Sequence, residues 1–175
     1  MSSSLILPYG GVLPTIDPSA FIAPHAVVIG DVVIGAETSV WFNCTIRGDV
    51  HEIRIGARTN IQDGTVIHVT GGKLGTYIGS DITIGHGAIL HACTLDDGCF
   101  IGMGATLLDG VVVESGAMVA AGAVVTPGKR VKRGELWAGN PAKLLRELKA
   151  EEMAFFLKSA ANYVSLAQTY RGSGA

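Results

Sequence analysis

The chain of 175 residues lacks an excess of either charge, a long apolar run and enough cysteines for a disulfide framework. Its 13 Lys and Arg residues against 15 Asp and Glu residues give a net charge of −2, so neither nucleic acid nor membrane is an expected partner. No stretch approaches the roughly 18 apolar residues of a membrane-spanning helix. The first residues lack the basic and apolar regions of a secretory signal. The chain has only three cysteines, and this small number favours a cytoplasmic protein.

A short repeat dominates what is present. Aliphatic residues, which we call heads, recur mostly every six positions, and glycine, with 24 residues in the chain, often comes next. Such periodicity is typical of solenoids. The residue four positions after a head is mostly small or β-branched, as the second inward position of a strand requires. The eighteen heads are Ile22, Val28, Ile34, Val40, Ile46, Ile55, Ile61, Ile67, Ile78, Ile84, Leu90, Leu95, Ile101, Leu107, Val113, Val119, Val125 and Val131.

Three strands close one triangular coil, so eighteen repeats predict an all-β solenoid of about six coils. A β-sandwich, the alternative, would place turn signals about every 8 to 12 residues. We therefore expect three parts: residues 1–21 leading into the first coil, a β-helix over 22–133, and 134–175 as a loop and a C-terminal helix. Apolar residues at a spacing near 3.6 predict this helix from Ala142 to about Tyr170, packed on the coils or on a neighbouring subunit.

Placing the polar residues on this repeat brings three of them into one file. We label the three faces A, B and C in chain order from Ile22. Arg47, His68 and His91 each directly follow a head of face B. They should therefore stack from coil to coil, about 4.8 Å apart. This register requires a loop between the heads Ile67 and Ile78, and the glycine-rich segment 70–75 suits a loop.

His86 lies on face A, one coil after Asp63 and its neighbour Gln62. Within one chain, faces A and B point apart, but a closed three-fold assembly brings face A of one subunit against face B of the next. Two histidines of one subunit and one of its neighbour would then converge. Three imidazoles with an open position form the catalytic zinc pattern. Unrelated histidines are the alternative, and we interpret His25 and His51 in that way.

Three segments that contain these residues resemble a known family. The strings Arg47-Gly48-Asp49, Asn60 to His68 and Ile84 to His91 are similar to those of the gamma-class carbonic anhydrases, hexapeptide-repeat proteins, and the similarity covers nearly the whole chain. It implies a left-handed parallel β-helix, a homotrimer and the reversible hydration of CO2 to bicarbonate by hydroxide on a metal at the subunit boundary.

The resemblance also implies residue roles. His68, His86 and His91 would bind the metal, by default Zn2+, although imidazole also suits Fe2+ or Co2+. Gln62 would hold the bound water or bicarbonate, and Asn60 would orient CO2. Arg47 and Asp49 would tie adjacent subunits together, Asp63 would support a ligand, and Tyr163 would approach the site from the final helix.

Two departures from the family pattern leave other functions open. Members of the best-studied type carry proton-moving glutamates where this chain has Val50 and Gly71-Gly72, so we expect weak or slow activity. The segment 139–143, Gly-Asn-Pro-Ala-Lys, also closes many hexapeptide acyltransferases. An acyl-CoA-dependent acyltransferase or thioesterase is therefore one alternative, and a non-catalytic metal-binding scaffold is another.

Overall fold

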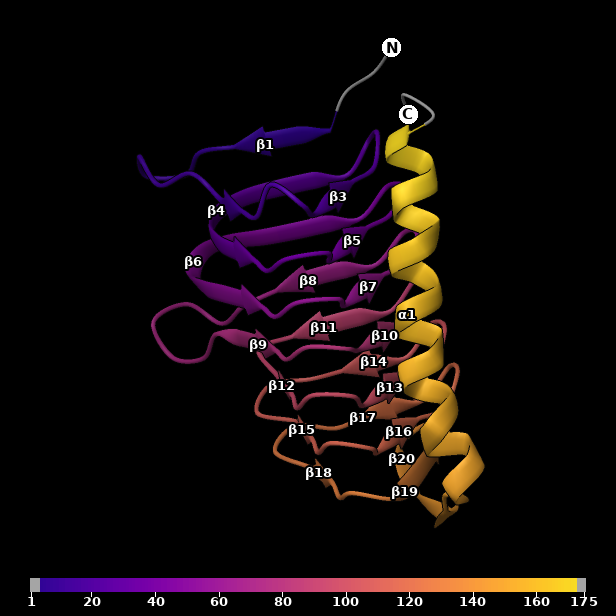
Figure 1. Ribbon diagram of the computed structural model, residues 1–175. Helices are drawn as coiled ribbons and strands as arrows, with labels where there is room; N and C mark the ends of the chain where they lie inside the picture. The colour runs from indigo at the N-terminus through magenta and orange to yellow at the C-terminus, as the bar shows by residue number, and fades with distance from the viewer. Residues whose placement is uncertain (1–3, 173–175) are drawn as a thin grey trace.

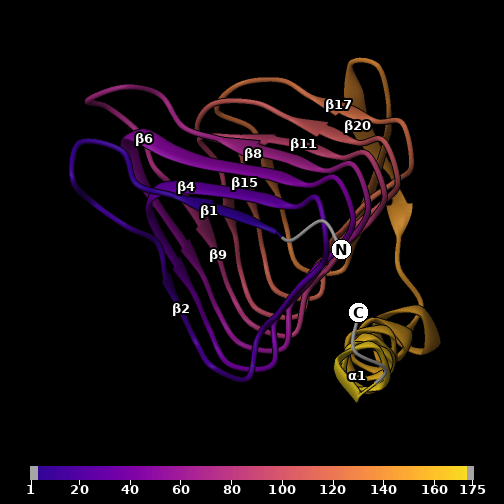
Figure 2. The same ribbon diagram turned by 90° about the horizontal axis from the view of Figure 1, so that it is seen from above.

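The computed structural model describes residues 4–172, which form a parallel β-solenoid of about seven turns with one helix beside it (Figure 1). Viewed from the N-terminal end, the chain turns anticlockwise as it runs away from the viewer, which makes the coil left-handed (Figure 2). The predicted fold class is confirmed. Among the described residues, no helix combines the length and apolarity needed to cross a membrane.

The strands stack on three faces, and strands on one face pair in parallel from coil to coil. Face A holds β3 (Phe21–Ile22), β5 (Ser39–Val40), β7 (Asn60–Ile61), β10 (Thr83–Ile84), β13 (Phe100–Ile101), β16 (Met118–Val119) and β19 (Glu135–Gly139). Face B holds β1 (Leu5–Leu7), β8 (Val66–His68), β11 (Ile89–His91), β14 (Thr106–Leu107) and β17 (Val124–Val125). Face C holds β2 (Thr15–Ile16), β9 (Thr76–Ile78), β12 (Thr94–Leu95), β15 (Val112–Val113) and β18 (Arg130–Val131).

Two long strands, β4 (Val27–Ile34) and β6 (Thr45–Ile55), run from face B round the corner onto face C. Seventeen of the eighteen heads are buried, so the repeat sets the core as predicted. One inward position differs from the simple repeat. Strand β6 carries three extra residues at the corner, which leaves Val50 46% exposed and gives its inward place to Ile53.

The N-terminal segment forms a coil of its own. Strands β1 and β2 pair with β4, so the solenoid begins before the first predicted head and has about seven turns instead of six. The sequence hides this coil because a hairpin bridged between Tyr9 and Val12 separates its two strands and breaks the six-residue spacing.

The C-terminal prediction was wrong in its details. The predicted loop 134–141 contains β19, and the predicted start of the helix is β20 (Ala142–Glu147), antiparallel to β19. The helix α1 begins later and spans Ala150–Gly172.

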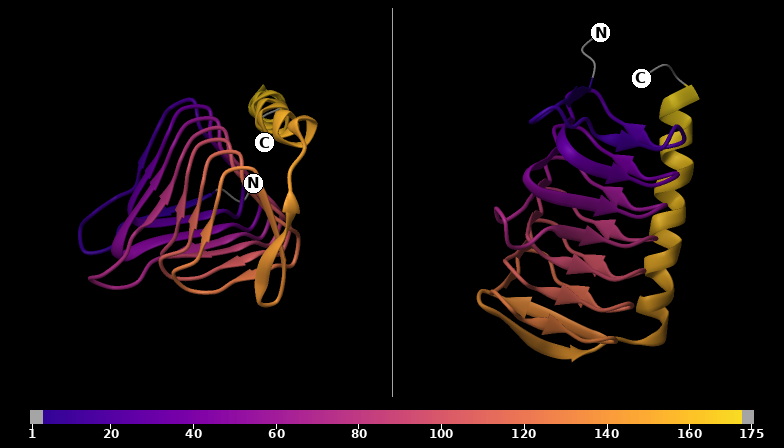
Figure 3. Two further views of the ribbon diagram at one scale, coloured as in Figure 1. Left: turned by 90° about the horizontal axis from the view of Figure 1, so that it is seen from below. Right: turned by 90° about the vertical axis from the view of Figure 1, so that its left-hand side faces the viewer.

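The reason lies in the end of the solenoid. The last coil has backbone groups that need partners, and a hairpin supplies them. Two leucines three residues apart do not distinguish a helix from an edge strand, and Leu145 is in fact 63% exposed. The helix runs along face A of the solenoid (Figure 3) and contacts β3, β5, β7 and β10. Its residues Ala160 and Ala167 are buried, and Phe156 is buried against Phe100 of β13 and Met118 of β16.

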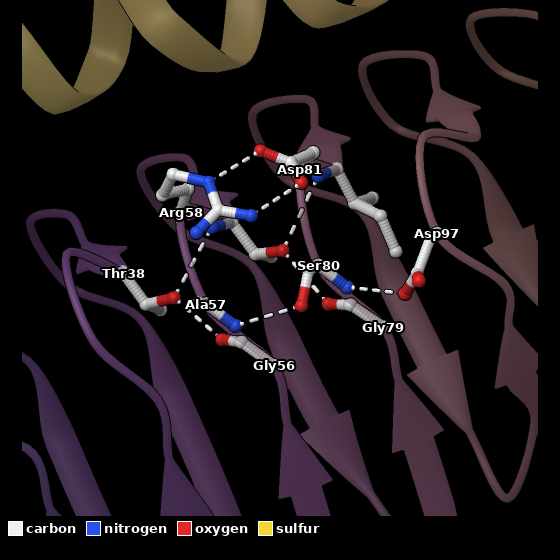
Figure 4. A network of polar contacts seen from close by, with 10 residues as sticks. Thr38, Gly56, Ala57, Arg58, Gly79, Ser80, Asp81 and Asp97 are labelled. Atoms are coloured by element: carbon white, nitrogen blue, oxygen red, sulfur yellow. Dashed lines mark hydrogen bonds and ion pairs between the residues drawn. The ribbon is translucent and has the colours of Figure 1, made fainter.

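Polar contacts order the corner between faces C and A (Figure 4). The hydroxyl of Thr38 donates to a carbonyl of the next coil at 2.7 Å, and Thr59 repeats this one coil later at 2.9 Å. Arg58 and Asp81, from neighbouring coils, form two hydrogen bonds of 2.7 Å. This ladder holds the chain immediately before β7, whose first residue is Asn60.

Candidate metal centre

His68 and His91 lie side by side on face B. They are paired in register on β8 and β11, and Nδ1 of His68 lies 3.3 Å from Nε2 of His91. Strand β6 pairs with β8 in a register that carries Arg47 to the same file. The predicted stack of these three residues is confirmed.

A carboxylate holds the far side of each ring. His68 Nε2 lies 3.0 Å from Asp49 Oδ1, and His91 Nδ1 lies 2.6 Å from Asp109 Oδ1. If each carboxylate accepts the ring N–H, the nitrogens that face each other both carry lone pairs. Two lone pairs at 3.3 Å need a proton or a cation between them. Nitrogens bound tetrahedrally at about 2.05 Å from zinc lie about 3.3 Å apart, so this donor set fits the metal.

The carboxylates stay ionised near neutral pH. Burial is the largest influence on Asp49 and raises its pKa, but hydrogen bonds from His68 and Arg47 more than offset it, and the net pKa is below its usual value. The Thr70 hydroxyl and then His91 hold the pKa of Asp109 below its usual value. Both groups therefore act as acceptors for ring N–H groups, which sets the tautomer of a ligating histidine.

Asp109 and Thr70 were missed by the sequence reasoning. Asp109 comes two residues after the head Leu107, in the coil that follows His91, so the repeat register could have located it. Thr70 lies in the loop after β8, as the predicted insertion required, and donates to Asp109 Oδ2. A loop residue has no repeat position, so no signal pointed to it.

His86 has its own carboxylate on face A. Its Nδ1 lies 2.9 Å from Asp63 Oδ2, and the two side chains are 45% and 43% exposed. No residue among 4–172 binds its Nε2. Across these same residues, no three His, Cys, Asp or Glu side chains of one chain gather closely enough to hold a metal. Within one chain His86 therefore stays apart from the histidine pair on face B.

Gln62 and Asn60 are buried between the strands and the helix. Gln62 Nε2 donates to Asn60 Oδ1 at 3.1 Å, and Asn60 Nδ2 donates to Thr83 Oγ1 at 2.9 Å and to Ile82 O at 3.2 Å. Both ends of the Asn60 amide are thus committed to protein groups. Asn60 therefore accepts a hydrogen bond from Gln62 and has no N–H left to donate to a substrate.

Tyr163 reaches a cavity of its own chain. This cavity of about 380 Å³ is bordered by Gln62, His86 and Tyr163, together with the apolar residues Phe100, Met103, Met118 and Phe155. The Tyr163 ring packs edge-on against Trp41, with centroids 5.5 Å apart. Burial, and then the charge of Asp63, raises the pKa of Tyr163, so its phenol keeps its proton and can donate it in a hydrogen bond.

The chain is similar to several known proteins. The hexapeptide family described as bacterial transferase hexapeptide (six repeats) matches residues 92–127. Gamma carbonic anhydrase 1, mitochondrial, of Arabidopsis thaliana is 53% identical over 167 residues, which are 93% of this chain and 61% of that protein. Carbonic anhydrase of Geobacillus kaustophilus is 44% identical over 167 residues, which are 95% of this chain and 91% of that protein.

One solved structure is similar to this chain in both sequence and fold. The hexapeptide transferase family protein from Anaplasma phagocytophilum is 51% identical, covers 95% of this chain and 98% of its own, and superposes with a TM-score of 0.92. The chain spans about three fifths of the length of the Arabidopsis relatives that it matches. Identity of 44% over 91% of the length of the Geobacillus protein assigns the family. The chain belongs to the gamma carbonic anhydrase family.

Proposed function

We propose that this protein catalyses the reversible hydration of CO2 to bicarbonate at a metal centre shared by neighbouring subunits of a homotrimer. His68 and His91 of one subunit and His86 of the next would bind the metal, by default Zn2+. The observation that carries the proposal is the pair of ring nitrogens 3.3 Å apart on face B, each ring backed by a carboxylate. The names of the relatives support the same activity.

A metal held by three imidazoles acts as a Lewis acid and lowers the pKa of bound water toward 7. The third imidazole has to come from another copy, because His86 lies on a different face from His68 and His91. Face A meeting face B is a head-to-tail contact, and such contacts close after three copies when the rotation is 120°. Fe2+ and Co2+ also bind imidazole and remain alternatives to zinc.

The residues around the cavity have complementary roles in this proposal. Gln62 donates through Nε2 to Asn60, so its Oε1 is left to accept a hydrogen bond from the hydroxyl of water or bicarbonate. Tyr163 offers a phenolic donor to the same cavity. Asp63 holds His86, and the Arg47–Asp49 pair holds His68, which orients the rings. A contact of Arg47 and Asp49 with the next subunit is part of the trimer proposal.

Proton export should be slow. The loop residue Gly72 donates its N–H to the carbonyl of Val50 at 3.3 Å, so the loop lies against Val50. Neither place carries a carboxylate that could pass protons to solvent. We expect CO2 hydration to be limited by proton transfer and to accelerate with buffer concentration, because external buffer then replaces an internal shuttle.

One sample tests the metal, the assembly and the activity. Protein purified without added metal should contain about one metal equivalent per chain and have a mass of about 54 kDa, three times 18.1 kDa, by light scattering. His91→Ala should lose the metal and CO2 hydration. His51→Ala should keep both, because within residues 4–172 the His51 imidazole only accepts a hydrogen bond from the adjacent Glu52 N–H, at 2.8 Å. A metal-free monomer, or a His91→Ala variant that keeps its metal, would refute the proposal.

A second function has one observation in its favour. The apolar side chains Phe100, Met103, Met118 and Phe155 make the cavity larger and less polar than CO2 requires, as an acyl group would need. An acyl-CoA-dependent transferase or thioesterase would release free CoA from a thioester, without dependence on His91. Bound metal with neither activity would favour a non-catalytic scaffold. A cytoplasmic location also belongs to the proposal, and it rests on the three buried free thiols.

A further inference from the structure

A continuous line of hydrogen bonds joins Gln62 to the C-terminal helix. Beyond the contact of Asn60 with Thr83, the Thr83 hydroxyl lies 2.9 Å from Ser159 Oγ on α1, 76 residues later in the chain. All four side chains are buried. Thr83 and Ser159 border the same cavity as Gln62 and Tyr163. The two hydroxyls are therefore close to the site without touching His68, His86 or His91.

Chemistry decides the direction of this line. The carbonyl of Ile82 can only accept, so the NH2 end of Asn60 must point to Ile82 and Thr83, and its oxygen must face Gln62. Thr83 Oγ1 accepts from Asn60, which leaves the Thr83 hydrogen available to Ser159. Donation therefore runs one way from Gln62 through Asn60 to Thr83, whereas between Thr83 and Ser159 either hydroxyl can be the donor. Hydrogen bonds in such a chain strengthen one another.

The same contact fixes the helix. Apolar packing of α1 on face A is not directional, but a hydrogen bond between buried hydroxyls specifies one depth and one register. Ser159 and Tyr163 are four residues apart and lie on the same side of the helix. A helix held at Ser159 therefore places the Tyr163 phenol at the cavity.

We infer that Thr83 and Ser159 are positioning residues, which together orient the acceptor oxygen of Gln62 and the phenol of Tyr163 toward one substrate. This inference rests on the proposed function for its effect on turnover, but the geometry it describes is independent of that function. The hydroxyls themselves do not touch the reacting atoms. Their loss should weaken catalysis without removing the metal.

The central experiment compares Thr83→Val, which removes the hydroxyl at similar volume, with Thr83→Ser, which keeps it. In the zinc-loaded protein, the side-chain amide of Gln62 is followed by 1H–15N NMR and assigned by its disappearance in Gln62→Glu. Thr83→Val should shift this signal and speed its hydrogen exchange, with kcat/KM lower by about five-fold, as expected for one hydrogen bond. Thr83→Ser should restore both, and zinc content should stay unchanged throughout.

Ser159→Ala tests the link from the helix side and covers the case in which Thr83→Val does not fold. Ser165→Ala is the matched control, because in the described part of the chain the Ser165 hydroxyl bonds only within the helix, to Ala161 O at 3.3 Å. A Gln62 amide signal that is unchanged in both Thr83→Val and Ser159→Ala would overturn the inference. So would a Thr83→Ser protein that behaves like Thr83→Val. If the wild-type protein hydrates no CO2, the proposed function fails. The NMR comparison still tests whether Thr83 and Ser159 orient the side chain of Gln62.

Discussion

Asp109 offers the sharpest test of the proposed metal centre, because its carboxylate lies directly against the ring of His91. Asp109→Asn keeps the volume of the side chain and removes its charge, so the 2.6 Å contact with His91 Nδ1 loses its ionic acceptor. The Thr70 hydroxyl can turn to accept from the new amide, so the loop should stay in place. A carboxylate behind a ligating histidine typically contributes 10- to 100-fold in metal affinity. We expect zinc to bind that much more weakly, by about 1.4 to 2.8 kcal/mol.

The assay is competition for zinc with a chelator of known affinity, at a protein concentration where the proposed trimer is intact. Asp96→Asn is the control, because Asp96 lies on face C beside β12, away from the histidines. The metal-free forms of both variants should melt within a few degrees of the wild type. Zinc affinity of Asp109→Asn within two-fold of the wild type, or an equal loss in Asp96→Asn, would refute the role given to Asp109.

Three further predictions concern the solenoid. Leu90→Ala removes a fully buried head and should lower the free energy of unfolding by about 2 to 5 kcal/mol, measured by denaturant titration; a smaller loss would mean that the core closes over the gap. Gly102→Ala would place a Cβ 2.3 Å from a backbone nitrogen of the next coil, so we expect a larger drop in melting temperature than for Gly172→Ala, where nothing lies within 4 Å. Burial raises the pKa of Cys44 to about 11 and that of Cys93 to about 12, so a thiol reagent at pH 8 should label neither until the protein is unfolded; rapid labelling of the native protein would contradict this.

The repeat predicts the core residues because side chains alternate between the two faces of a strand, and a coil of three strands returns each inward position to the same place. The stack of His68 on His91 follows from that register, and the pairing of β8 with β11 confirms it. The additional N-terminal coil and the strand β20 did not follow, since both lie where the six-residue spacing is interrupted. Partners of the site were equally hidden where they come from loops, as for Thr70.

The six-residue repeat is enough to predict the solenoid, its three faces and the file of His68 and His91, because periodic burial leaves only one register in which the apolar heads point inward. Only the folded chain shows which nitrogens face each other, that Asp109 contacts His91, and that Ser159 of the helix reaches Thr83, 76 residues earlier. Those contacts join groups that have no common period. They depend on the path of a loop and on the seating of a helix, and these are decided by packing over the whole chain.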